Sequence, residues 1–219
     1  PTFASAYDNR SYANFKLGKY DLAIIDSNTA LSLEEKNSRI RGNFITFSKK
    51  NFTLGLAKIG SLIKEYPQKD IWVYVRSQLY RYKKDYNNAL ADFTRIFEMI
   101  PENYRSAILT ARAELYGEMG LHDKAIVDFT ESIELDSSSA LDFGNRGDEY
   151  RLIGNYAAAI QDFDKAIEMD PEQPWYYYRR GWVKDEFLKD HEGGLADYTS
   201  AIEVDRNYAY TYLHRGRLY

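Results

Sequence analysis

The stretch from Tyr150 to Pro171 reads YRLIGNYAAAIQDFDKAIEMDP, and its pattern decides the fold. Gly154 separates two segments that each have helical spacing. In the second segment Ala159, Phe163 and Ala166 follow one another at intervals of four and three residues, which places them on one face of an α-helix. Pro171 cannot continue that helix. The stretch therefore predicts the end of one helix, a tight turn and a second helix.

Near copies of this stretch recur along the chain with a fixed period. Arg112, Arg146 and Arg180 follow one another at steps of 34 residues. Pro67 and Pro101, which lie in the segments between such arginines, are also 34 residues apart. Two independent markers with one period indicate tandem units of two helices each. A glycine between the helices suits a left-handed helix cap.

The repeats are expected to fill the chain as one continuous array, 1–219, without a linker. No stretch alternates with the period of two that is typical of a strand. The expected boundaries are 4–35, 36–69, 70–103, 106–139, 140–173 and 174–208, followed by a partial or capping helix at 209–219.

The second unit departs most from the pattern. Its turn is Lys49-Lys50 instead of a glycine, Gly55 stands where other units have alanine, and Lys58 replaces a recurrent aspartate. Glycine inside a helix costs about 0.5–1 kcal/mol relative to alanine. We expect looser or displaced packing in this unit.

The pattern resembles the tetratricopeptide repeat (TPR) family over nearly the whole chain. In the fifth unit the resemblance rests on Gly147, Tyr150, Gly154, Tyr156, Ala159, Phe163, Ala166 and Pro171, and in the fourth on Ala113, Tyr116, Gly120, Ala125, Phe129 and Ser132. The segment 143–147 is similar to repeats of bacterial members. The resemblance implies an all-α, right-handed α-solenoid of tandem helix-turn-helix repeats, with the first helix of each repeat on the concave side.

Composition excludes several functional classes. The chain has no cysteine, so disulfides, thiol catalysis and cysteine-based zinc sites are absent. A formal net charge of -4 argues against non-specific nucleic-acid binding. No stretch reaches the about 18 apolar residues of a membrane span. Because the sequence begins with Pro1, we expect any targeting segment to lie outside it, which fits a soluble protein of the cytoplasm or, after removal of a signal, the periplasm.

The residues that could carry chemistry favour a structural interpretation. His122 and His191 occupy the turn slot that Tyr156 holds in the fifth unit. His214 has no second ligand near it in the sequence, and the adjacent Asp185 and Glu186 are expected to be solvated. We therefore predict no catalytic residue, no metal site, no cofactor and no enzyme, although a site assembled from distant repeats stays an alternative.

The periodic arginines allow two interpretations. They could form a basic ladder for an acidic ligand, or each could pair with an aspartate of the second helix. We favour pairing, because guanidinium and carboxylate groups at a fixed spacing form bidentate ion pairs. Arg112 and Arg146 are then expected to be substantially buried against aspartates such as Asp128 and Asp162.

Helical phase predicts a groove along the first helices. The side chains expected to line this groove form a stripe that is aromatic in the sixth unit and acidic in the fourth and fifth units. Such a stripe favours a peptide with an apolar anchor and basic flanks. In some relatives of the resembled family, lysines and asparagines on these helices clamp acidic chaperone tails. The expected partner-binding residues of the groove in this chain are Tyr74, Gln78, Arg81, Glu114, Glu118, Asp148, Arg151, Trp175, Tyr178, Trp182 and Asp185.

The function expected from this groove is a non-catalytic scaffold or adaptor that binds a segment of a partner protein. Two alternatives stay open: a self-association module that acts through the apolar C-terminal helix, and a regulatory part of a larger protein with a separate catalytic domain. Trp175 and Trp182 could also pack against that last helix instead of facing a ligand.

Overall fold

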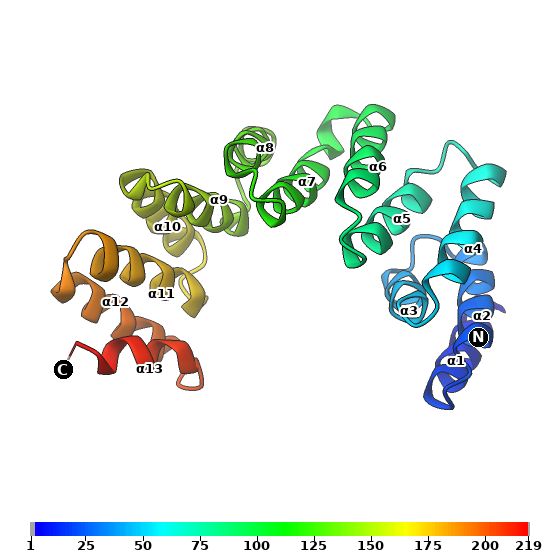
Figure 1. The fold of residues 1–219 in the computed structure, drawn as a ribbon, viewed down its shortest axis with the longest axis horizontal. Helices are drawn as coiled ribbons and strands as arrows, with labels where there is room; N and C mark the ends of the chain where they lie inside the picture. The colour runs from blue at the N-terminus through cyan, green and yellow to red at the C-terminus, as the bar shows by residue number, and fades with distance from the viewer. Residues whose placement is uncertain (1–2, 219) are drawn as a thin grey trace. The chain divides into compact units, whose positions relative to one another are not determined.

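The computed structural model describes residues 3–218. Within that range the chain is all-α: helices alternate with short turns, and no strand is present (Figure 1). Contacts divide the chain into two units, Pro1–Pro101 and Glu102–Tyr219. Each unit is a series of helical hairpins, as expected for short helix–helix connections.

The first unit contains three hairpins. Their helices are α1 (Phe3–Lys16), α2 (Tyr20–Leu33), α3 (Ser38–Ser48), α4 (Phe52–Glu65), α5 (Asp70–Tyr82) and α6 (Tyr86–Met99).

The second unit begins with a short 3-10 turn, η1, and ends with a helix that has no hairpin partner among the described residues. Its elements are η1 (Glu102–Tyr104), α7 (Ser106–Glu118), α8 (His122–Leu135), α9 (Ala140–Leu152), α10 (Tyr156–Met169), α11 (Pro174–Trp182), η2 (Val183–Phe187), α12 (His191–Val204) and α13 (Ala209–Gly216).

The turns confirm the predicted role of glycine. Gly18, Gly120 and Gly154 have φ between +73° and +80°, in the left-handed region. Lys84 and Lys189 occupy the same place in their repeats with φ of 58° and 59°. A lysine in this conformation is strained, because its Cβ approaches the following carbonyl oxygen.

In each hairpin a small residue lies three positions after the start of the second helix, where that helix packs against the first. Ala23, Ala89, Ala125 and Ala159 are all fully buried there. In the fifth repeat Ala159 packs with Phe163 and Val183 in one apolar cluster. Small side chains let the two helices approach closely, and the aromatic ring fills the adjacent space.

The arginine prediction is confirmed as ion pairing within repeats. Arg112 and Arg146 each donate two hydrogen bonds, from Nε and Nη2, to Asp128 and Asp162 at 2.6–2.8 Å. The arginine side chains are 16% and 15% exposed. The bidentate hydrogen bonds raise the pKa of both guanidinium groups. The basic ladder for an acidic ligand is therefore not available at these two positions.

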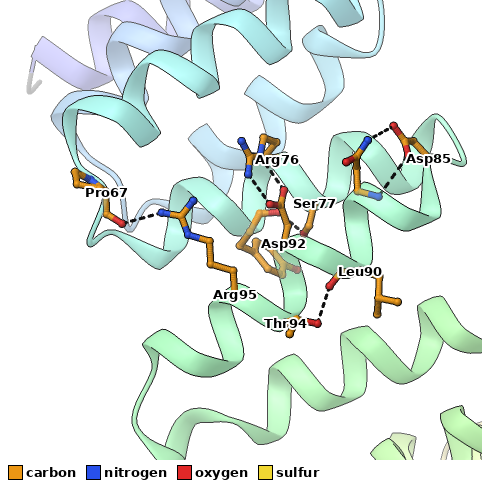
Figure 2. A network of polar contacts seen from close by, with 10 residues as sticks. Pro67, Arg76, Ser77, Asp85, Leu90, Asp92, Thr94 and Arg95 are labelled. Carbon is orange, nitrogen blue, oxygen red and sulfur yellow. Dashed lines mark hydrogen bonds and ion pairs between the residues drawn. The ribbon is translucent and has the colours of Figure 1, made fainter.

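The same pair recurs in other repeats. Arg76 donates two hydrogen bonds to Asp92, at 2.9 and 2.6 Å (Figure 2). Equivalent bidentate pairs join Arg10 to Asp26 and Arg180 to Asp197. The periodic arginines thus tie the first helix of a hairpin to the second.

Candidate functional site

An acidic pocket lies between α7 and α9 in the second unit. Its volume is about 320 Å³. The lining residues are Glu114, Gly117, Glu118, Phe129, Asn145, Asp148 and Glu149. Three acidic residues expected in the groove, Glu114, Glu118 and Asp148, therefore come together at one place.

Sequence reasoning missed Glu149, which belongs to the same pocket. Its Oε2 lies 2.6 Å from Nδ1 of His122, at the start of α8. Burial raises the pKa of the Glu149 carboxyl, and the hydrogen bond to His122 only partly opposes this effect. The absence of a side chain at Gly117 gives this carboxylate room, since a Cβ there would overlap Oε1 of Glu149. The signal in the sequence was the replacement of the turn tyrosine by His122.

Asp148 connects the acidic pocket to a second feature, which we call the arginine–aromatic patch: Arg151, Arg179, Trp175 and Trp182. Nε of Arg151 donates to Asp148 at 2.7 Å, and Arg179 lies 3.4 Å from the same carboxylate. The guanidinium of Arg151 stacks over the Trp182 ring at 4.6 Å from its centroid, and that of Arg179 lies at 5.4 Å. Arg179 was not among the predicted residues.

The aromatic residues of the predicted stripe have different environments. Trp175 and Trp182 are half-buried, whereas Tyr178 is only 8% exposed. Tyr178 packs among Tyr198, Tyr208 and Tyr210, and its hydroxyl lies 3.2 Å from Nε2 of His214 on α13. Burial raises the pKa of Tyr178.

The two tryptophans also differ in their neighbours. Trp175 meets Phe163 edge to face, with ring centroids 6.3 Å apart. Trp182 lies 6.0 Å from the ring of His214. The alternative of packing against the last helix therefore describes one side of Trp182, but not the Phe163 contact of Trp175.

The expectation that Asp185 is solvated is wrong. Asp185 is 6% exposed, and its Oδ1 lies 2.6 Å from Nδ1 of His191. The hydroxyl of Tyr198 donates to its other oxygen at 3.4 Å. The neighbouring Glu186 is exposed, as expected. Asp185 turns inward because it lies in the widened turn η2, which sequence periodicity did not predict.

The remaining predicted groove residues lie in the first unit. Tyr74, Gln78 and Arg81 are half-buried along α5. Tyr74 meets Phe93 edge to face at 6.3 Å.

A second cavity, of about 290 Å³, lies beside α7, α8 and α9. It contains a buried carboxylate, Asp142, which accepts hydrogen bonds from Thr110 at 2.9 and 3.0 Å and from Ser132 at 2.7 Å. Asp142 is 3% exposed. The two hydroxyl groups hydrogen-bond to the buried carboxylate and link α7, α8 and α9, which explains how an acid is accommodated away from solvent.

Family comparisons decide the class of protein. A model described as "Tetratricopeptide repeat" matches residues 4–37, 73–103 and 106–139, and one described as "TPR repeat" matches 147–183. The chain belongs to the tetratricopeptide repeat family. Comparison of this TPR chain with curated proteins gave no match.

Solved structures of other TPR proteins share the fold. YrrB, whose structure is described as that of a TPR protein with an unusual peptide-binding site, is 16% identical, with a TM-score of 0.64 over 87% of this chain and 97% of YrrB. A TPR protein from Parabacteroides merdae is 22% identical, with a TM-score of 0.63 over 98% of this chain and 84% of its own.

A third solved structure contains a ligand. The first TPR domain of Spaghetti, bound to the HSP90 peptide SRMEEVD, is 22% identical to the TPR chain, with a TM-score of 0.50 over 52% of this chain and 90% of its own. Among the described residues, no helix combines the length and apolar character needed to cross a membrane. The fold and the family together make this chain a repeat scaffold of the kind that mediates protein interactions.

Proposed function

We propose that the second unit is a non-catalytic adaptor that binds an extended peptide, with a Lys or Arg side chain of the peptide in the acidic pocket. The observation that carries this proposal is the convergence of Glu114, Glu118, Asp148 and Glu149 on one cavity. A cavity lined by several carboxylates favours a cation of complementary charge over an anion. The HSP90 peptide bound by Spaghetti has three acidic residues in SRMEEVD, so the partner proposed here has the opposite charge.

The arginine–aromatic patch supplies the second half of the proposed surface. It is continuous with the acidic pocket through Asp148, which lines the pocket and pairs with Arg151 and Arg179. Half-buried tryptophans offer apolar contact area with little conformational entropy to lose. A peptide with an apolar or aromatic residue close to its basic residue fits both features, whereas a second cation would be repelled by the two arginines.

The direct test uses arrayed peptides that carry one central Arg, paired with the same peptides carrying Gln there. Affinity is measured by fluorescence anisotropy with purified protein. We expect the protein to bind the Arg peptides more tightly than the Gln peptides. Glu118 is exposed, and Glu118→Lys should weaken binding of the Arg peptides at least about tenfold, equivalent to about 1.4 kcal/mol. The matched control is Glu134→Lys on α8, also exposed and outside the pocket lining. Equal binding by both variants, or no preference for Arg, contradicts the proposal.

The pH dependence gives an independent check. Burial raises the pKa of Glu149, so this carboxylate takes up a proton at a higher pH than an ordinary glutamate does. The pocket therefore loses negative charge earlier as the pH falls. Affinity for the Arg peptides should therefore begin to decline at a higher pH than the titration of an ordinary glutamate would give, and Glu149→Gln should remove this early part of the decline.

A second candidate function is self-association through α13. Three large side chains on this helix are exposed: Tyr210 (65%), Leu213 (58%) and Tyr212 (43%). We infer that a second copy of the chain could cover them. Light scattering over a concentration series should then show a dimer that Leu213→Glu abolishes; a monomer at every concentration contradicts this function and leaves the peptide proposal unaffected.

A further inference from the structure

The sixth repeat contains one more residue than its neighbours, and the structure shows which turn accommodates the additional residue. Paired arginine and aspartate are 16 residues apart in Arg112–Asp128 and Arg146–Asp162 but 17 apart in Arg180–Asp197. The extra residue lies in η2, a π-helical turn in which the Leu188 N–H donates to the Val183 carbonyl at 3.2 Å. Such single π turns are frequent at functional sites.

The π turn brings two carboxylates close to a histidine of α13. One oxygen each of Asp185 and Glu186 and one ring nitrogen of His214 lie within 4.8 Å of one another. Asp185 is buried and hydrogen-bonded to His191, whereas Glu186 is exposed. Asp185 and Glu186 are adjacent, but His214 lies far from them in the sequence, which is why sequence inspection did not connect the three.

His214 presents a nitrogen that lacks a protein partner. Its Nε2 lies 3.2 Å from the Tyr178 hydroxyl, while Nδ1 is buried and has no hydrogen-bond partner among the described residues. If Nε2 carries the proton and donates to Tyr178, the lone pair of Nδ1 is left without a donor. Metal-binding histidines commonly use one nitrogen as the ligand and donate with the other.

We propose that Asp185, Glu186 and His214 form a binding site for a divalent transition-metal ion, with Zn²⁺ as the best fit. One imidazole nitrogen and two carboxylate oxygens match the donor types that Zn²⁺ uses. In a tetrahedral Zn²⁺ site the donor atoms lie about 3.4 Å apart, as follows from bond lengths of about 2.1 Å. The three donors, which lie within 4.8 Å of one another, would close to that spacing when the ion binds, and water would complete the coordination.

The expected consequence of metal binding is a link between two elements. Asp185 and Glu186 belong to η2, and His214 belongs to α13, a helix without a hairpin partner among the described residues. A bound ion would hold α13 against the sixth repeat and stabilise the folded form over the unfolded one. The site is then a structural clamp for the terminal helix and needs no catalytic role.

The test is calorimetric titration of the chelator-treated chain with ZnCl₂, followed by hydrogen exchange of α13. We expect one equivalent of Zn²⁺ to bind and amide exchange in 209–216 to slow. Glu186→Gln should weaken binding at least about tenfold, because it removes a charged ligand. Since Glu186 is exposed, this variant tests the site without disturbing the core. The matched histidine control is His122→Asn, which removes a ring bound to Glu149 and should leave Zn²⁺ affinity unchanged.

Three results would overturn the proposal: a dissociation constant weaker than about 100 µM, equal affinity for the parent chain and Glu186→Gln, or an equal loss of affinity in His122→Asn. His214→Asn should abolish binding but can also loosen the aromatic packing around Tyr178. Its melting temperature without metal is therefore measured beside that of Glu186→Gln.

Discussion

The second and fifth repeats are both helical hairpins, but they are held together differently. In the fifth repeat Arg146 pairs with Asp162, Gly154 makes a left-handed turn and Ala159 is buried between the helices. In the second repeat Lys58 occupies the place of the aspartate, and Arg41 donates instead to the backbone carbonyl of Glu35 at 3.1 Å.

The packing differs accordingly. Helices α9 and α10 contact each other along their length, whereas α3 and α4 share much less contact, and α4 also packs against α2 and α5. The displaced packing expected for this repeat is therefore confirmed. Loss of the ion pair and of the glycine turn lets a hairpin open, and burial against neighbouring repeats then replaces burial within it.

The largest expected difference between the two repeats concerns the ion pair. Asp162→Ala leaves Arg146, whose side chain is 15% exposed, without its bidentate partner. Removing one member of a buried pair costs about 3–5 kcal/mol. Lys58→Ala, at the equivalent place, should change stability by less than about 0.5 kcal/mol. Urea unfolding followed by circular dichroism measures both, and similar losses would show that Asp162 does not hold its hairpin as described.

Overpacking of the fifth hairpin should have the next largest effect. Ala159 is fully buried between α9 and α10, so Ala159→Leu forces the helices apart and should cost about 1–3 kcal/mol. Ala125→Leu should behave alike in the fourth repeat. The control is Ala157→Leu, an exposed position on the same helix. An unchanged melting temperature for Ala159→Leu would mean that the close contact lies elsewhere.

The success of sequence reasoning followed the regularity of each repeat. Period, turn glycines and the spacing of arginine and aspartate are local properties that recur, so one repeat could be used to interpret another. The same reasoning failed at Asp185, because an inserted residue changed the helix from α to π geometry and turned this side chain inward. Periodicity assumes a constant rise and rotation, and it cannot locate an insertion within a helix.

The candidate site was predicted only in part, for a related reason. Helical phase identified the acidic positions Glu114, Glu118 and Asp148, which do meet in one pocket. It did not identify Glu149 or Arg179, whose roles depend on partners from other helices, His122 and Asp148. Contacts between repeats depend on side-chain reach as well as phase, and a single sequence does not reveal them.

Gly55 of the second repeat provides a further test of the packing between its two helices, with a smaller expected effect on stability. A Cβ on Gly55 would lie 2.4 Å from Cβ of Ser48, so Gly55→Ala should cost about 1 kcal/mol or more despite the better helix propensity of alanine. Ser48→Gly in the same chain should recover part of that loss, and a double-mutant cycle measures the coupling. Gly60→Ala is the matched control: no atom lies within 4 Å of its Cβ, so it should gain about 0.5–1 kcal/mol. Absence of coupling between Gly55 and Ser48 would remove the steric explanation.

The smallest expected effect on stability comes from exchanging glycine and lysine at the turn between the two helices of a repeat. Lys84 has φ of 58° in the place that Gly154 occupies in the fifth repeat, so Lys84→Gly relieves strain and should stabilise the chain by about 1 kcal/mol. Gly154→Lys should lose a similar amount by the same reasoning. In the second repeat Lys49 has a right-handed conformation and Lys50 is not among the described residues with positive φ. Lys50→Gly should therefore bring no gain and should cost a few tenths of a kcal/mol in chain entropy. Thermal unfolding of the three variants distinguishes the turn types, and a gain from Lys50→Gly equal to that from Lys84→Gly would mean that glycine acts there through something other than its left-handed backbone.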